Sequence, residues 1–212
     1  MARQVLDGRV QIRCGSSEGT GMAHEPHQQG STSVSLEDYL AKEATSRTKH
    51  EYVLGQVYAL AGATEDHSRI ALNIAAALLP AARAASCRVV GSDQRLQASQ
   101  DLYYYPDVQL LCDPSDDDAL IKRRPCVVVE VSSERTEAID RREKLLVYRG
   151  IASLRLYLIV AQDRREVTVH VRDPAGTWQT HQAQGHDSVP IECLGDHQLS
   201  LDAIYQDVLP GQ

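Results

Sequence analysis

The apolar run Cys126-Val127-Val128-Val129, which ends at Glu130, restricts the possible fold more than any other feature of the sequence. Its β-branched residues follow one another without polar alternation, which predicts a central strand that is covered on both faces. Because helical patterns occur elsewhere in the chain, an α/β fold is the expected way to cover that strand. Glu130 would then end a buried strand, and since an unpaired buried carboxylate is costly, we expect it to have a partner.

The segments around this strand alternate between helical and strand patterns. Residues 66–83 and 137–149 are predicted to form two long helices, the second of which is closed by Gly150. A capping-box-like sequence predicts a short helix over residues 35–44, and Gly55-Gln56 is expected to be the two-residue turn of a hairpin. Further strands are predicted at residues 88–90, 94–98, 108–112, 154–160 and 167–171, with an edge strand at Trp178 and a short helix near Leu201.

A single domain is expected to hold this core. Residues 1–33 are rich in Gly, Ser, Gln and His, so we interpret them as a poorly ordered leader, with Met22 as an alternative start, and residues 34–212 as one domain. No apolar stretch approaches the about 18 residues of a membrane span, which favours a cytoplasmic protein without a membrane partner. The five cysteines have no C-x-x-C spacing and are expected to be buried, reduced thiols.

Basic residues are concentrated in one part of an acidic chain. The net charge is −7, yet residues 122–165 contain 11 Lys and Arg against 6 Asp and Glu, a local balance of +5. The pairs Arg123-Arg124, Arg141-Arg142 and Arg164-Arg165 could contact the phosphates of a nucleic acid. The alternative interpretation is a solvated charged surface without a ligand.

Three charged side chains are candidates for one site: Asp107 at the start of a strand, Glu130 at the end of the apolar strand, and Lys144 on the next helix. Two carboxylates about 4 Å apart repel by about 4 kcal/mol at an effective dielectric constant of about 20, so their approach requires compensation. A bound Mg²⁺ ion, a raised pKa on one carboxyl, or an ion pair between Glu130 and Arg95 would each supply it. Lys144 also has a simpler interpretation, an i,i+4 pair with Asp140.

Several residues occur together in an order that is typical of a known family. The order is Glu51 and Gly55 in a hairpin, His67 at the start of a helix, Tyr104-Tyr105-Pro106-Asp107, Val128-Val129-Glu130-Val131-Ser132, and then Thr136, Asp140, Lys144 and Tyr148. From about Ser35 to Tyr205, the chain resembles the Uma-two family of restriction endonuclease-like proteins, which belongs to the PD-(D/E)XK nuclease superfamily. The joint spacing of these residues is much more specific than any single motif.

This resemblance implies a restriction-endonuclease-like mixed β-sheet flanked by helices. It also implies that Asp107 and Glu130 bind Mg²⁺, with Mn²⁺ as a possible substitute, and that the backbone carbonyl of Val131 completes the ligand set. Glu51 is implied to be an auxiliary acidic residue of the catalytic site. Glu51 and His67 also have structural interpretations, as a surface residue before a hairpin and as part of a helix cap.

The lysine that the superfamily carries two residues after its glutamate is replaced by Ser132. Lys144 resembles the migrated lysine seen in this family, and Asp140 and Tyr148 flank it on the same helical face. The implied function is that of a Mg²⁺-dependent DNA endonuclease, expected to be a homodimer because cutting two strands invites two-fold symmetry. Ser132 keeps an alternative open, a catalytically degenerate nuclease fold that binds nucleic acid or a protein partner.

Overall fold

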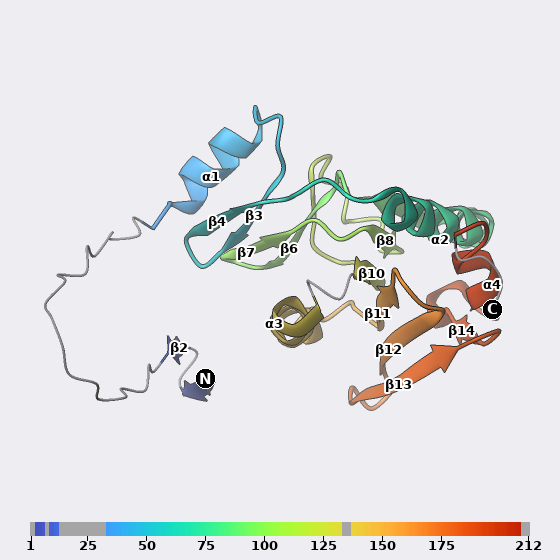
Figure 1. Cartoon of the computed structure of the whole chain (residues 1–212). Helices are drawn as coiled ribbons and strands as arrows, with labels where there is room; N and C mark the ends of the chain where they lie inside the picture. Colours follow the sequence, from blue (N-terminus) through green and yellow to red (C-terminus); the bar gives the residue numbers. More distant parts are fainter. Residues whose placement is uncertain (1–2, 7–8, 13–32, 133–136, 209–212) are drawn as a thin grey trace, which may run out of the picture. The chain divides into compact units, whose positions relative to one another are not determined.

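The structure of the chain divides into two units, Met1–Thr32 and Ser33–Gln212. It is a computed structural model that describes residues 3–6, 9–12, 33–132 and 137–208, and the side chains of residues 33–132 and 143–208 (Figure 1). In the first unit, strands β1 (Arg3–Leu6) and β2 (Arg9–Ile12) pair antiparallel. None of the described helices is long and apolar enough to cross a membrane.

A six-stranded mixed sheet forms the centre of the second unit, in the order β13-β12-β11-β10-β8-β5. Its strands are β5 (Arg88–Gly91), β8 (Val108–Leu111), β10 (Val127–Ser132), β11 (Leu156–Ala161), β12 (Glu166–Arg172) and β13 (Trp178–Gln184). β10 and β11 run parallel, whereas the other neighbours run antiparallel. The apolar run is thus a central strand, and Trp178 lies on an edge strand, as the sequence predicted.

Helices cover the two faces of this sheet. The helices that cover it are α2 (Glu65–Ala84), α3 (Glu137–Arg149) and α4 (Leu201–Ile204), with a 3-10 turn at Glu192–Leu194. A further helix, α1 (Leu36–Glu43), packs through Tyr39 against Tyr52 and Tyr103. Val129 shares one hydrophobic cluster with Ile74 of α2 and Ile204 of α4. Val128 belongs to a second cluster with Tyr148 of α3. Because successive strand residues point to opposite faces, α2 and α3 pack on opposite sides of β10.

A second, five-stranded sheet has the order β4-β3-β7-β6-β9. Its strands are β3 (His50–Val53), β4 (Gln56–Ala59), β6 (Arg95–Ser99), β7 (Leu102–Tyr104) and β9 (Ile121–Lys122), and a separate pair is formed by β14 (Ser188–Pro190) and β15 (Gln198–Ser200). The β3–β4 turn is Leu54-Gly55, with φ of 49° and 87°, so the predicted Gly55-Gln56 turn was wrong by one residue. A Cβ on Gly55 would collide with the Ser33 side chain, and the positive φ at this position favours glycine in any case.

Four cysteines are paired, so the expectation of reduced thiols was wrong for them. Disulfides join Cys87 to Cys112 and Cys126 to Cys193. The first pair follows from the register of β5 and β8, in which Arg88 lies opposite Leu111 and the adjacent cysteines therefore meet. Such long-range pairing cannot be inferred from the spacing of cysteines in the sequence.

The loop of residues 113–125 is held by hydrogen bonds and ion pairs of its own acidic residues. Asp116 is buried, and its Oδ2 accepts hydrogen bonds from the backbone N–H groups of Arg123 at 2.9 Å and Arg124 at 2.7 Å. The Arg123 guanidinium pairs with Asp118 at 3.1 Å, and that of Arg124 pairs with Asp113 at 3.2 Å. These two arginines are therefore partly neutralised within their own loop.

Candidate functional site

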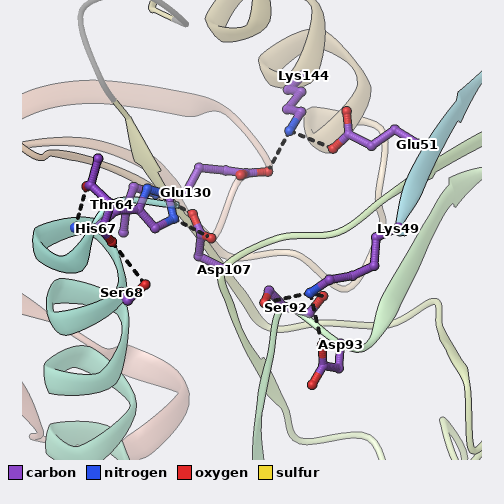
Figure 2. Close-up of polar contacts among 11 residues, drawn as sticks. Lys49, Glu51, Thr64, His67, Ser68, Ser92, Asp93, Asp107, Glu130 and Lys144 are labelled. Atoms are coloured by element: carbon purple, nitrogen blue, oxygen red, sulfur yellow. Dashed lines mark hydrogen bonds and ion pairs between the residues drawn. The ribbon is translucent and has the colours of Figure 1, made fainter. Parts of the chain in front are cut away.

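The register of two strands brings Asp107 and Glu130 to the same place. β8 and β10 pair antiparallel with Val108 opposite Val129, so one further step along the ladder sets Asp107 opposite Glu130. Asp107 lies just before β8, where its side chain contacts His67 of α2, whereas the Glu130 side chain contacts Tyr148 of α3. Figure 2 shows the Glu130 side chain extending toward Lys144 on α3 and the Asp107 carboxylate turned toward His67 on α2.

The Asp107 carboxylate is held by two contacts. Its Oδ2 accepts a hydrogen bond from the backbone N–H of Val131 at 2.8 Å, and its Oδ1 lies 2.8 Å from His67 Nε2 (Figure 2). Val131 was predicted to act through its carbonyl, whereas the contact described is made by its amide. These contacts fix the direction in which Asp107 presents its oxygens to the site.

Glu130 meets two residues of α3. Lys144 Nζ lies 3.2 Å from Glu130 Oε1, and the Tyr148 hydroxyl donates to the same oxygen at 2.8 Å. Lys144 also contacts Glu51 Oε1 on β3 at 3.0 Å, so the ammonium bridges two carboxylates (Figure 2). The partner of Glu130 is therefore Lys144, not the Arg95 weighed from the sequence. Lys144 and Tyr148 stand one helical turn apart, which places both on the face that covers Glu130.

Burial makes the charges of this cluster interact strongly. The side chains of Lys144, Glu51 and Glu130 are 13%, 13% and 14% exposed. Burial raises the pKa of Glu130 to about 7; Lys144 opposes this rise, while Asp107 and Glu51 add to it. Burial alone would lower the pKa of the Lys144 ammonium, but Glu130 and Glu51 outweigh it and raise that pKa. Glu51 and Glu130 thus share the Lys144 ammonium, while the neighbouring Asp107 carboxylate contacts His67.

His67 is the site residue that sequence reasoning misjudged. The cap of α2 is Thr64, whose Oγ1 accepts the backbone N–H of His67 at 3.2 Å, so His67 is the capped residue and not the cap. Its ring instead reaches Asp107, and that hydrogen bond raises the pKa of His67 against the opposing effect of burial. The sequence did contain a signal for the cap, because His67 follows a threonine at a helix start by three residues.

The loop before Asp107 is fixed from its other side. The Tyr105 hydroxyl donates to Glu43 Oε1 at 2.8 Å, and Glu43 Oε2 lies 2.9 Å from His50 Nδ1. Since Tyr105 precedes Asp107 by two residues, this network anchors the segment that carries the carboxylate into the site.

Some of the other predicted residues lie away from this cluster. Others have side chains that the structure does not describe. The side chains that are not described include those of Thr136, Asp140 and the Arg141-Arg142 pair. Arg164 pairs with Glu166 at 2.9 Å and Arg165 pairs with Asp202, so their charges are compensated locally. Ser132 is buried at the end of β10.

The oxygen donors of the cluster suit a hard cation, although the described donor atoms do not surround a single point. Within the described residues, no three His, Cys, Asp or Glu side chains are already arranged to hold an ion. Lys144 and Tyr148 both contact Oε1 of Glu130, so Oε2 is the oxygen left for a further ligand among the described contacts. Asp107 and Glu130 provide carboxylate oxygens, the ligands that Mg²⁺ prefers.

The chain is similar in sequence to proteins of Synechocystis sp.. The chain is 33% identical over 175 residues to an uncharacterized protein, slr1290, of Synechocystis sp., covering 82% of this chain and 92% of that protein. A second Synechocystis protein, sll1609, is 29% identical over 129 residues, covering 59% of this chain and 73% of that protein.

A solved structure supports the fold. A protein of Anabaena variabilis, described as "a putative nuclease belonging to DUF820", superposes with a TM-score of 0.68 at 15% identity, covering 83% of this chain and 99% of that one. The α/β, restriction-endonuclease-like mixed sheet predicted from the sequence is thereby confirmed. The model of the Uma2 family, described as "Putative restriction endonuclease", matches residues 36–203. The chain therefore belongs to the Uma2 family, as the order of its site residues indicated.

Proposed function

We propose that this protein is a nuclease that hydrolyses phosphodiester bonds of DNA and depends on a divalent cation, Mg²⁺ or Mn²⁺. One observation carries the proposal: Glu51 and Glu130 share the ammonium of Lys144 in a mostly buried cluster, and a third carboxylate, Asp107, lies close enough to Glu130 to help raise its pKa. A phosphodiester anion entering this negative site would be repelled. A bound cation would compensate the carboxylates and make the site attractive to the anion.

Asp107 and Glu130 would hold the cation, with the carbonyl of Val131 as a further oxygen donor. The cation would supply Lewis acidity, which favours ionisation of water at neutral pH and neutralises charge on the phosphate. Asp107 is suited to this role because its carboxylate is already oriented by the Val131 amide. Tyr148 orients Glu130 in the same way through its hydroxyl.

Lys144 would position the attacking water or stabilise the negative charge that develops on the phosphate oxygens. Glu51 holds the Lys144 side chain at its other end, and the two carboxylates keep the ammonium protonated. The position of Lys144 beside Glu130 supports an active site over a degenerate one, because a positive group stands where Ser132 supplies none.

A plasmid-nicking assay tests the proposal. Purified protein is incubated with supercoiled DNA and Mg²⁺, Mn²⁺ or EDTA, together with the Asp107→Asn, Glu130→Gln and Lys144→Met variants. We expect metal-dependent nicking that each variant lowers by about 100-fold or more, the typical scale of a lost electrostatic group at a reacting centre. Asp93→Asn is the matched control, because Asp93 is a highly exposed carboxylate that pairs only with Lys49 among the described ion pairs.

Two results would count against the assignment. Nicking that persists in EDTA, or that survives in all three variants, would remove these residues from the catalytic site. DNA binding without nicking in any metal, unchanged by the variants, would support the alternative of a degenerate binding module.

A further inference from the structure

The contact between His67 and Asp107 has the spacing of two ligands of one ion. His67 Nε2 lies 2.8 Å from Asp107 Oδ1. Adjacent donor atoms of an octahedral ion with bonds of about 2.1 Å lie about 3.0 Å apart, because they subtend a right angle at the ion. An ion could therefore bind these two atoms with little movement, whereas Glu130, which is turned toward Lys144, would have to bring its free Oε2 toward them.

Both partners are held in place by their own elements. His67 lies in the first turn of α2, where Thr64 caps its backbone amide. Asp107 is fixed by Val131, which occupies Oδ2 and leaves Oδ1 toward the imidazole. The side chains of His67 and Asp107 are 22% and 15% exposed, so the pair is mostly shielded yet reachable from solvent. Glu130 is close enough to act on the charge of His67.

We propose that His67 is a third protein ligand, which joins Asp107 and Glu130 to form a centre with one nitrogen and two carboxylate donors. This inference rests on the proposed function, since it concerns the same cation. Imidazole binds first-row transition ions better than it binds Mg²⁺, whose ligands are oxygens. The centre therefore selects Mn²⁺, or a later ion of that row, over Mg²⁺.

A second histidine–carboxylate pair in the chain provides a matched control. His186 Nδ1 lies 2.8 Å from Asp202 Oδ1, the same distance as in the His67 pair. His186 is 82% exposed. Its partner Asp202 also pairs with Arg165, a positive group. The two ligand atoms of this pair thus lie at the same distance as in the His67 pair, but no second carboxylate joins them among the described ion pairs. The pair is therefore not expected to hold an ion.

The test measures metal binding directly on the full-length, metal-stripped protein. Isothermal titration with Mn²⁺ and with Mg²⁺ is carried out for the wild type and for the His67→Gln, Glu130→Gln and His186→Gln variants. Glutamine at position 67 keeps a polar group near Asp107 but removes the imidazole nitrogen. We expect His67→Gln to weaken Mn²⁺ binding by at least the about 10-fold that loss of an outer-shell partner costs, and Mg²⁺ binding by less than about 3-fold.

Pulsed EPR of the Mn²⁺-loaded protein supplies a readout that a merely structural role would not change. Coupling of Mn²⁺ to a directly bound nitrogen is expected in the wild type and in His186→Gln, and it should disappear in His67→Gln. Mn²⁺ binding that requires Glu130 but is unchanged in His67→Gln, without nitrogen coupling, would overturn the inference and leave the proposed function intact. Absence of any divalent-ion binding by the wild type would overturn both.

Discussion

Replacing Lys144 by methionine should make the stability of the ion-free protein depend on pH in a new way. Methionine keeps much of the length and apolar volume of the lysine stem but removes the positive charge between Glu51 and Glu130. Lys144 is the strongest influence that opposes the raised pKa of Glu130. In the variant, the pKa of Glu130 in the folded state must therefore lie above its wild-type value of about 7.

The direction of the effect follows from proton linkage. The ordinary pKa of Glu130 is 4.5, and it is raised on folding, so the unfolded state binds fewer protons and stability falls as pH rises. In the wild type this loss runs from about pH 4.5 to about 7 and then stops, because Glu130 is ionised in both states. In the variant Glu130 ionises at a higher pH than in the wild type, and the loss continues above pH 7 at up to about 1.4 kcal/mol per pH unit.

Between pH 7 and pH 8.5 the variant should therefore lose up to about 2 kcal/mol more than the wild type. For a chain of this size, that corresponds to a fall in melting temperature of about 4–8 °C. Urea unfolding followed by circular dichroism, in EDTA at pH 6 and pH 8.5, measures the difference. Lys49→Met is the control: Lys49 pairs with the exposed Asp93, and such a pair contributes about 1 kcal/mol or less. A stability gap between Lys144→Met and wild type that is equal at both pH values would refute this account of the cluster.

Two further substitutions test contacts that hold the site together. Thr64→Ala removes the side-chain cap of α2, and it should lower the free energy of unfolding by about 1 kcal/mol; an unchanged urea midpoint would argue against the cap. Tyr148→Phe removes the hydroxyl that donates to Glu130 while keeping the ring in the core, and a loss of about 1.5–3 kcal/mol at pH 8.5 is expected. A loss no larger than that of Tyr58→Phe, at an exposed tyrosine, would contradict the proposed strength of this bond.

The parts of the fold that the sequence predicted are those governed by local periodicity. β10 could be recognised from three successive valines, and α3 from its helical pattern and Gly150, because these signals lie within one element. The proximity of Asp107 and Glu130 required one more step, since Asp107 precedes β8, Glu130 lies within β10, and these two strands proved to be neighbours. Their functional roles remain predictions that the nicking and binding experiments test.

Features that depend on register or helix rotation could not be predicted in this way. The contact of His67 with Asp107 joins residues 40 positions apart, and it depends on how α2 is rotated over the sheet. The disulfide of Cys87 and Cys112 depends on the offset between β5 and β8. Asp116 lies in an acidic run, a pattern typical of a solvated loop. Its side chain is nevertheless buried, because it accepts hydrogen bonds from two backbone amides of its own loop.

The geometry of β10 explains how a lysine on α3 can stand in for one on the strand. Residues 130 and 132 lie on the same face of β10, because strand side chains alternate with a period of two. α3 covers this face, since Tyr148 and Val128 share one hydrophobic cluster. A lysine at position 132 and a lysine at position 144 would therefore approach Glu130 from the same side of the sheet. The requirement set by the carboxylates is an ammonium on that side, and Lys144 meets it at 3.2 Å from Glu130, which leaves position 132 free to hold a small buried serine.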